Sequence, residues 1–455
     1  MTRFATRFQN IDRTCAERLA SEFDSPVYLL DESGIHSRLA DLQRDALAVY
    51  ERSRIAISYK TNPTAGVLVD LHRRGALAEV VSGDEYRIAR SLGVPTSEII
   101  FNGPAKSDDD LKLAISGNSF LHCDHEDEVT RVQAIAQQTG QVAKIGLRLY
   151  FPQEDNRDRF GFPATTDTQC EASRMIGRIT ESPSLELGGL HAHIGTNVRA
   201  LDRFQRFAKT YSDFVEWATA EHGIELDWID LGGGLAGIAP LVSENRFEPF
   251  PLPSTSEYCR AVIEPFLPWL DRCEKKPDLF LEPGRTLFNA FGAILVTVIG
   301  RRPTDEQGVA SVILNAGLTS LHFAWKYNLP VHVCRATRQS ADNGDDVEMP
   351  IAKPRLTRLL GPTCMEQDVV CRPIMLPELV PGDQLVIFGT GCYSMAMANS
   401  FIRFRLGTIG WQADDSFRWL RMPETIEHSR RLDVLEPVVK GIPAGKERGN
   451  HERNF

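Results

Sequence analysis

A lysine, Lys60, closes the short apolar run IAISYK (55–60) and is followed by Thr-Asn-Pro. A lysine that points into a protein interior is expensive to bury as an ammonium, so it needs a partner or a lowered pKa. A desolvated lysine is also what imine formation with a carbonyl cofactor requires. A lysine that emerges into solvent at a strand end would explain one isolated residue, but its companions along the chain favour the chemical interpretation.

Two further segments contain groups that suit a phosphate. Gly232, Gly233 and Gly234 end the run DWIDLGGG (227–234), and backbone N–H groups at such a turn can approach a phosphate closely. Thr196, in the segment HIGTN, offers a hydroxyl to the same phosphate. A tight turn between a strand and a helix would explain the three glycines equally well.

Acidic, basic and imidazole side chains also lie in or just after apolar runs, as Lys60 and the three glycines do. Glu282 and Arg285, in the segment EPGR, follow an apolar run. The carboxylate suits a protonated pyridine nitrogen and the guanidinium suits a phosphate or carboxylate, although a simple ion pair would also explain them. His191 and His193 have the same parity along one strand, so both are expected to face one side. One of them could stack on a planar cofactor, and a satisfied core histidine is the alternative.

These residues lie in or beside eight short apolar or β-branched runs. The runs are IAISYK (55–60), AEVVS (78–82), IIFNG (99–103), FLHCD (120–124), KIGLRLY (144–150), GGLHAHIG (188–195), DWIDLGGG (227–234) and LFLEPGR (279–285). Helical patterns separate them, such as HEDEVTRVQAIAQQTG (125–140), which has acidic residues in its first turn. Strands that alternate with helices predict parallel pairing, and eight such units predict a (β/α)8 barrel with its site at the C-terminal ends of the strands.

After residue 285 the pattern changes to strands joined by turns, which predicts a separate, mostly β domain. The expected strands lie in VTVIGRR, VASVILNAG, VHVCRAT, RLTRLLGPTC, DQLVIFGTGCY and FIRFRLG. Residues 340–354 are expected to form a solvated loop within this domain. The predicted organisation is an N-terminal segment that packs with the β domain (1–34), the barrel (35–285), a β-sandwich or barrel-like domain (286–435) and a flexible tail (436–455).

Composition excludes several classes of protein. The 61 acidic residues outnumber the 51 basic ones, giving a formal net charge of -10, and no Lys/Arg-rich run predicts nucleic-acid binding. No apolar run approaches the ~18 residues that span a bilayer, and the N-terminus lacks the apolar core of a secretory signal. The nine cysteines show no metal-ligand spacing. We therefore expect a cytoplasmic protein in a reducing compartment, with no membrane association and no metal site.

Eight ordered motifs carry a resemblance that covers nearly the whole chain. They are SYKTNP, EVVSGDE, GLRLYFP, GLHAHIGT, DLGGG, EPGR, GPTCMEQD and GTGCY. The sequence resembles the fold-type III pyridoxal-phosphate-dependent decarboxylases, which include the diaminopimelate, ornithine and arginine decarboxylases. The resemblance implies pyridoxal 5'-phosphate as cofactor and an α/β fold, with a TIM-like (β/α)8 barrel plus a C-terminal mostly-β domain, as in alanine racemase and ornithine decarboxylase. It also implies a homodimer with shared active sites.

The resemblance assigns catalytic roles to three residues. Lys60 matches the lysine that forms the internal aldimine, and His193 matches the histidine stacked on the cofactor ring. Cys364 matches a cysteine supplied by the partner subunit, which returns a proton to Cα after decarboxylation. The implied reaction passes from an external aldimine through loss of CO2 to a quinonoid carbanion, which the protonated pyridinium stabilises.

The remaining matched positions are implied to bind the cofactor. Arg148 and Glu79 match polar positions beneath its ring, and Glu282 matches the acid paired with the pyridine nitrogen. The matched phosphate-binding positions are Thr196, Gly232, Gly233 and Gly234, with Arg285 nearby and Tyr393 contributed by the β domain.

The sequence departs from the family at the positions that recognise the far end of the substrate. The family places a glutamate or aspartate directly after the cysteine, where this chain has Met365, with Glu366 one residue later. An arginine that binds a distal carboxylate aligns with Phe323, beside His322, and Tyr327 matches a family tyrosine. Met365 cannot pair with a cation, and Glu366 in a strand would point to the opposite face. Diaminopimelate, lysine and ornithine are therefore disfavoured as substrates.

An amino acid with a bulky, neutral or anionic tail fits these positions better. Relatives in siderophore and other secondary-metabolite pathways decarboxylate conjugated amino acids such as a citryl-linked diaminopropionate, and we expect a specialised decarboxylase of this type. Three alternatives stay open: a diaminopimelate- or ornithine-type decarboxylase with altered distal recognition, an amino-acid racemase or epimerase, and a non-catalytic cofactor-binding relative. A racemase would need a second base, usually a tyrosine, where this chain has Cys364. Non-catalytic relatives typically lose Lys60 or the cysteine.

Overall fold

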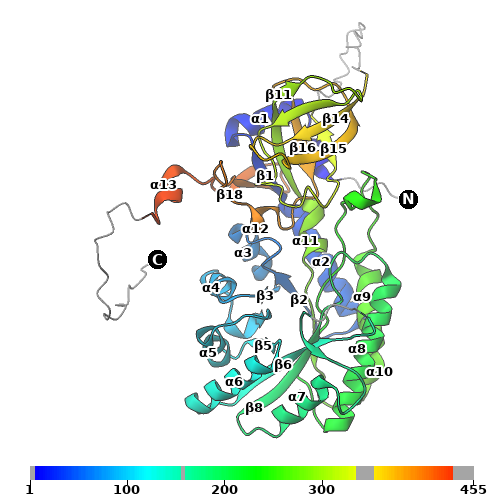
Figure 1. The fold of residues 1–455 in the computed structure, drawn as a ribbon. Helices are drawn as coiled ribbons and strands as arrows, with labels where there is room; N and C mark the ends of the chain where they lie inside the picture. The colour runs from blue at the N-terminus through cyan, green and yellow to red at the C-terminus, as the bar shows by residue number, and fades with distance from the viewer. Residues whose placement is uncertain (1–5, 155–158, 335–352, 434–455) are drawn as a thin grey trace.

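The computed structural model describes residues 6–154, 159–334 and 353–433 of the 455-residue chain. Figure 1 shows two parts stacked end to end, a helix-covered barrel in the lower half of the view and a β domain above it. Among the described residues, no helix is both long and apolar enough to cross a membrane. The expected tail and most of the expected loop at 340–354 lie outside the described residues.

A closed sheet of eight parallel strands forms the barrel. Its order is β5-β4-β3-β2-β10-β9-β8-β6, and pairing of β6 with β5 closes the circle. The strands are β2 (Ser53–Ser58), β3 (Leu77–Val80), β4 (Ile99–Phe101), β5 (Phe120–Cys123), β6 (Ala143–Tyr150), β8 (Leu185–Ala192), β9 (Trp228–Asp230) and β10 (Asp278–Leu281). All eight coincide with predicted strands, so the (β/α)8 barrel is confirmed. One further short strand, β7 (Phe162–Pro163), extends the edge beside β6 and was not predicted.

Amphipathic helices surround the barrel. They are α2 (Glu32–Val49), α3 (Ala65–Arg73), α4 (Gly83–Ser91), α5 (Asp108–Ser116), α6 (Glu126–Thr139), α7 (Glu171–Thr180), α8 (Leu201–His222), α9 (Thr255–Ile263) and α10 (Leu267–Arg272). Local sequence fixes their ends, as in α5, where Ser107 caps the helix and Asp110 completes a capping box. In α6 the first turn is acidic and the helix ends at Gly140 in the left-handed conformation.

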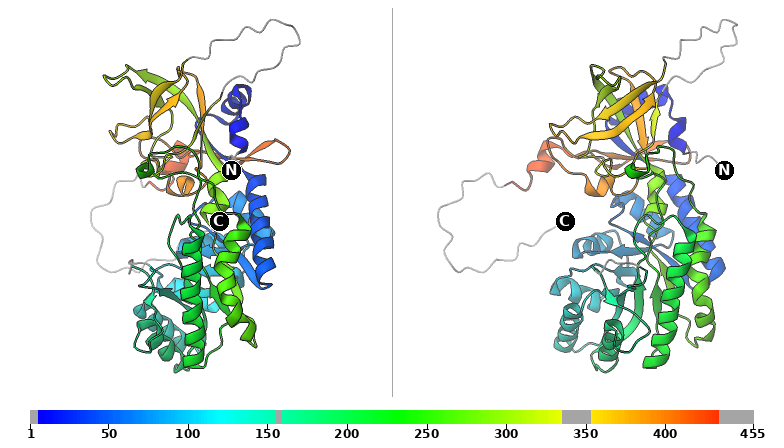
Figure 2. Two further views of the ribbon diagram at one scale, coloured as in Figure 1. Left: turned by 90° about the vertical axis from the view of Figure 1, so that its right-hand side faces the viewer. Right: turned by 45° about the vertical axis from the view of Figure 1, so that its right-hand side comes forward.

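The β domain is a nine-stranded sheet built from both ends of the chain. The strands are β1 (Val27–Asp31), β11 (Gly292–Arg302), β12 (Ala310–Leu314), β13 (Val331–Val333), β14 (Arg355–Leu360), β15 (Val369–Leu376), β16 (Gln384–Phe388), β17 (Thr408–Trp411) and β18 (Phe417–Arg421). The accompanying helices are α1 (Arg13–Phe23), α11 (Arg285–Phe288), α12 (Ser394–Met397) and α13 (Ile426–Arg430). Both views in Figure 2 show α1 beside this sheet.

Strand β1 lies in the middle of the sheet, although it precedes the barrel in sequence. It pairs antiparallel with β11, where Tyr28 faces Ile294, and parallel with β17, where Tyr28 faces Thr408. All five residues of β1 are buried. The chain therefore begins in the β domain, passes through the whole barrel and returns to the same sheet.

One expected strand of the β domain is absent. The segment FIRFRLG (401–407) forms bends, and the strand begins only at Thr408. Ile402 has φ 68°, which a β-branched residue adopts only at a break in an extended chain. Alternating apolar residues were therefore a misleading signal here, and Phe401, Ile402 and Phe404 are exposed.

Polar side chains join the β domain to the barrel at the C-terminal ends of the barrel strands. The Asn62 side-chain amide donates to the carbonyl of Gly391 at 3.0 Å, and the Tyr393 N–H donates to the carbonyl of Thr61 at 2.7 Å. The Asn289 side chain donates to the carbonyl of Gly389 at 2.7 Å. These contacts place the loop before α12, and with it Tyr393, beside the end of β2.

The central position of β1 makes its side chains essential to the β domain. We expect Leu29→Ala to lower the free energy of unfolding by about 2–5 kcal/mol, because a fully buried leucine leaves a cavity. The matched control, Leu47→Ala, removes a leucine that is 48% exposed on α2 and should change stability by less than about 0.5 kcal/mol. Urea unfolding measures both. Equal losses for the two variants would contradict the assigned role of β1.

Candidate active site

A cavity of about 680 Å³ opens at the C-terminal ends of the barrel strands. Its size falls within the range of small-molecule sites. The polar side chains that line it come from most of the barrel strands or the segments that follow them: Lys60, Glu79, Asn102, Arg148, Tyr150, Arg159, His191, His193, Thr196 and Glu282. The structure thus brings together seven of the predicted site residues, and it adds Asn102, Tyr150 and Arg159.

Lys60 follows β2 and points into this cavity, where its ammonium pairs with the buried carboxylate of Glu79. Burial alone would lower the pKa of Lys60, but the charges of Glu79 and Glu282 outweigh it and raise that pKa. Burial likewise opposes ionisation of Glu79, and the ion pair with Lys60 overcomes it and lowers the pKa of Glu79. Of the two expected possibilities, the lysine therefore has a partner rather than a lowered pKa.

Two more carboxyl groups, Asp230 and Glu282, lie beneath the cavity. Both are at least 95% buried, and their oxygens lie within 4.8 Å of each other and of a His191 nitrogen. Burial raises the pKa of Asp230 to about 7. Burial, reinforced by Asp230 and Glu79, raises the pKa of Glu282 well above its usual range. Three carboxyl groups beside one ammonium cannot all ionise cheaply, so this cluster retains a proton near neutral pH.

The two predicted histidines occupy different positions. His191 is 2% exposed at the floor of the cavity, and its ring stacks on that of His122 with centroids 5.0 Å apart. Burial lowers the pKa of His191 well below its usual range, so its ring is neutral. His193 follows the end of β8 and lines the cavity, and its Nδ1 accepts the N–H of Gly233 at 3.1 Å.

The glycine turn after β9 has no room for side chains. A Cβ on Gly233 would lie 2.2 Å from the carbonyl oxygen of Glu282, and one on Gly234 would lie 2.7 Å from that of Gly195. Gly232 and Gly234 also have positive φ angles, 62° and 112°. Thr196 lies near this turn, and the Arg285 guanidinium donates to its hydroxyl at 3.3 Å. A hydroxyl, a guanidinium and a turn without side chains together suit an anionic group.

Aromatic side chains from the β domain border Arg285. The guanidinium lies 4.7 Å from the ring of Tyr393 and 5.5 Å from that of Tyr327. Phe323 packs edge-on against both rings, with centroids 5.7 Å and 6.2 Å away. Tyr393 has a positive φ of 64°, an unusual conformation for tyrosine, which the contact of its N–H with the end of β2 helps to hold. An apolar ring therefore stands where the family arginine was aligned.

Cys364, Met365 and Glu366 lie in a turn between β14 and β15, not in a strand. Glu366 is therefore not turned away from Met365 by strand alternation, and that prediction was wrong. Cys364 is exposed, and it is not one of the residues that line the described cavity. The turn is shaped by the buried Asp368, whose carboxylate accepts the N–H of Thr363 at 3.0 Å and its hydroxyl at 2.6 Å.

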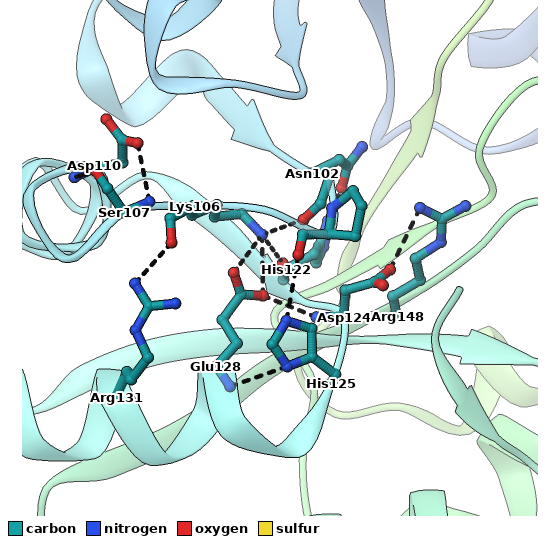
Figure 3. Close-up of polar contacts among 12 residues, drawn as sticks. Asn102, Lys106, Ser107, Asp110, His122, Asp124, His125, Glu128, Arg131 and Arg148 are labelled. Carbon is teal, nitrogen blue, oxygen red and sulfur yellow. Dashed lines mark hydrogen bonds and ion pairs between the residues drawn. The ribbon is translucent and has the colours of Figure 1, made fainter. Parts of the chain in front are cut away.

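A buried ion pair supports the cavity wall from behind (Figure 3). The Lys106 ammonium lies 3.1 Å from both carboxylate oxygens of Glu128, and neither side chain is exposed. Lys106 also donates to the carbonyls of Gly103 at 2.6 Å and His122 at 2.9 Å. One ammonium thereby joins the ends of β4 and β5 to α6. Nearby, Asp124 lies 3.5 Å from the guanidinium of Arg148.

Several residues of this site were not predicted from the sequence, among them Asn102, Lys106, His122 and Trp228, and Asp230 had no predicted role. Asn102 and His122 lie within predicted strands, so their polarity at buried positions was the available signal. Trp228 resembled an ordinary core residue. Their importance follows from contacts between neighbouring strands, which no single strand reveals.

The chain is similar to known proteins over most of its length. Residues 36–289 match a family model described as "Pyridoxal-dependent decarboxylase, pyridoxal binding domain". The diaminopimelate decarboxylase of Methanocaldococcus jannaschii is 27% identical over 410 residues, covering 86% of this chain and 87% of the relative. That of Bacillus subtilis is 24% identical over 438 residues, covering 93% and 94%.

Solved structures show the same fold. The M. jannaschii diaminopimelate decarboxylase in complex with L-lysine has a TM-score of 0.78 at 24% identity, covering 93% of this chain and 95% of that chain. A structure described as SrLDC in complex with PLP and cadaverine has a TM-score of 0.72 at 20% identity, covering 91% and 96%. The predicted two-part architecture is confirmed, and because the family model matches more than half of the sequence, the chain belongs to the pyridoxal-dependent decarboxylases.

Proposed function

We propose that this enzyme removes the α-carboxylate of an amino acid or amino-acid conjugate whose tail is neutral or anionic, and that diaminopimelate and ornithine are poor substrates. The observation on which this depends is the position of Phe323. Its ring packs against Tyr327 and Tyr393 beside Arg285, so an aromatic ring lies at the position that aligns with the family's arginine. Specialised decarboxylases of siderophore or other secondary-metabolite pathways act on substrates of this kind.

The site residues fit pyridoxal phosphate, the cofactor of this family. The glycine turn admits no side chain, and Thr196 and Arg285 beside it suit the phosphate. Lys60 is available for the aldehyde, and Glu282 in the buried acid cluster suits the pyridine nitrogen. Further contacts are assigned to Glu79, Arg148, His193 and Tyr393. When bound, the cofactor supplies an electron sink for the electron pair that remains after CO2 departs.

Side chains of the protein hold and donate the protons of this reaction. Glu79 pairs with the Lys60 nitrogen and favours positive charge on it. Glu282 and Asp230 retain a proton where the pyridine nitrogen is expected, because burial favours the acid form of both and the charges of Asp230 and Glu79 reinforce this at Glu282. His193, fixed by the N–H of Gly233, offers a flat face to the cavity. Cys364 is assigned as the donor that returns a proton to Cα.

The role of Cys364 requires a second subunit. Its side chain is exposed in the turn between β14 and β15 and lies outside the lining of the described cavity. We therefore propose a homodimer in which each subunit contributes this cysteine to its partner's site. The cavity residues of one chain and the cysteine of the other would together form each complete active site.

Other functions have less support. The named relatives are diaminopimelate decarboxylases at 24–27% identity, so an ordinary enzyme with different distal recognition is the second candidate. A racemase needs a base on the far side of the cavity, and the motif at that position supplies Cys364 rather than a tyrosine. A non-catalytic relative is disfavoured because Lys60, Glu282 and Arg285 are all present in one site.

Substrate preference is the most direct test of the proposal. We expect CO2 release, with pyridoxal phosphate present, from an amino acid with a neutral, anionic or conjugated tail such as citryl-diaminopropionate. Diaminopimelate, lysine and ornithine should be turned over at least about tenfold more slowly, because nothing pairs with their distal charges. Rapid turnover of diaminopimelate would instead support the second candidate, and racemisation without CO2 release would exclude decarboxylation.

Restoring the missing charges should move specificity toward diaminopimelate. We expect the double variant Phe323→Arg, Met365→Glu to raise kcat/KM for diaminopimelate by about tenfold or more, since each charge-assisted hydrogen bond contributes about 1.5–3 kcal/mol. The matched control is Trp325→Arg, which adds an arginine to the same segment at a side chain that is 61% exposed. If kcat/KM for diaminopimelate rises equally in both variants, or in neither, positions 323 and 365 do not recognise the substrate.

Mixing inactive subunits tests the shared site. Lys60→Ala should lower activity by at least about 10²-fold, and Cys364→Ala should also be strongly impaired. In mixtures of the two, each hybrid dimer regains one intact site, so about a quarter of wild-type activity should return after random exchange. Subunit exchange is checked with differently tagged chains. Full exchange without recovery would contradict the shared site.

A further inference from the structure

A chain of buried polar side chains crosses the barrel beneath the cavity. It runs from Trp228 through His122 and Asn102 to Glu79 and Glu282, which lie on or next to five different strands. All five residues are at most 5% exposed. The proposed reaction assigned roles to the two glutamates only, and the other three residues have no role in it.

The direction of each hydrogen bond in this chain is fixed by its first member. An indole N–H can only donate, and that of Trp228 lies 2.8 Å from Nε2 of His122. Nε2 is therefore an acceptor, and the proton of the neutral imidazole must lie on Nδ1. Burial, with Lys106 and Arg148 nearby, lowers the pKa of His122 to about 3, so the ring stays neutral.

The tautomer of His122 in turn fixes the amide of Asn102. The Nδ1–H of His122 donates to Oδ1 of Asn102 at 2.7 Å. The amide nitrogen then faces the other way and donates to Oε1 of Glu79 at 3.1 Å and to Oε1 of Glu282 at 2.6 Å. One NH2 group thus serves both carboxylates. With the amide reversed, its oxygen would face them and would favour their protonated forms.

The ends of the strands that contain Asn102 and His122 are held together by the side chain of Lys106. Lys106 donates to the backbone carbonyls of His122 and Gly103, the residue after Asn102, and pairs with Glu128 (Figure 3). Because these groups are buried, the spacing between Asn102 and His122 is fixed by the ends of β4 and β5. The chain of hydrogen bonds is therefore preformed in the fold.

We propose that Asn102 is a positioning residue that orients Glu79 and Glu282 toward the cofactor, and that Trp228 sets the direction of its amide through His122. This role does not depend on which substrate the enzyme uses. It assigns a function to three buried residues that do not touch substrate in the proposed reaction.

The consequence concerns the charge beside Lys60. Donation by Asn102 stabilises the negative charge of Glu79, and that of Glu282 whenever it is ionised, and this negative charge favours a proton on the Lys60 nitrogen. The other charged or titratable groups around the hydrogen-bond chain and Lys60 are Glu85, Lys106, Arg148, His191, His193, Asp230, Tyr258 and Tyr393. Substitution of Trp228 replaces none of them, so the matched variants below compare the hydrogen-bond chain with its packing.

The test uses the holoenzyme and Trp228→Phe, which removes the N–H and keeps a ring. The visible absorbance of pyridoxal phosphate linked to a lysine changes as the linking nitrogen loses its proton, and a pH titration gives the midpoint. We expect the variant to move this midpoint down by about one unit, a tenfold loss in proton affinity, and to weaken cofactor binding severalfold. The matched control is Phe120→Leu, whose ring packs edge-on against Trp228 at 5.1 Å without entering the chain.

Phe120→Leu should lower the melting temperature but leave the midpoint of the pH titration within about 0.2 pH unit of the wild-type value. Asn102→Leu should reproduce the downward shift. His122→Gln keeps an acceptor and a donor in its amide, so its midpoint should shift less than that of His122→Leu, which has neither. An unchanged midpoint in folded Trp228→Phe and Asn102→Leu would overturn the proposal. An equal shift in Phe120→Leu would also overturn it, because packing alone would then explain the effect.

Discussion

Burial of three carboxyl groups around a single ammonium is the constraint on which the site depends. Glu79, Asp230 and Glu282 lie below the surface of the barrel beside Lys60. Isolated charges in such a place would be very costly, so the groups divide their roles. Glu79 pairs with the lysine and stays ionised, while burial raises the pKa of the other two, so that they retain a proton. This division provides an anion beside the amine and an acid where the pyridine ring is expected.

The barrel makes such a cluster possible. Parallel strands that close into a circle bring their C-terminal ends to one face, so residues distant in sequence converge there. Neighbouring strands also supply the neutral donors and acceptors, Asn102, His122 and Trp228, that keep the carboxylates apart and oriented. The β domain then adds aromatic side chains beside Arg285, among them Phe323 and Tyr393, whose rings pack edge-on.

Much of this arrangement was predictable from the sequence, because it depends on local patterns. The eight barrel strands were predicted from apolar runs that end in polar residues or glycine. The unusual residue types at these strand ends also identified Lys60, His191, Glu282 and the glycine turn. Contacts between strands were not predictable. The amide of Asn102, for example, has its direction set by an indole from another strand. Alternating residues also predicted strands wrongly where the backbone turns, as at Ile402 and in the turn that contains Met365.

The pairing of β1 with β11 and β17 has a consequence for how the protein folds. Leu29 pairs with Ala293, and Tyr28 with Thr408, so the barrel is an insertion within the β domain. During synthesis β1 emerges first but has no partner until the entire barrel has been made. The barrel is thus expected to form as the earlier folding unit, while an apolar strand waits unpaired. Long-range pairing of this kind slows folding and exposes an aggregation-prone edge, so chains interrupted before β11 would require a chaperone to remain dispersed.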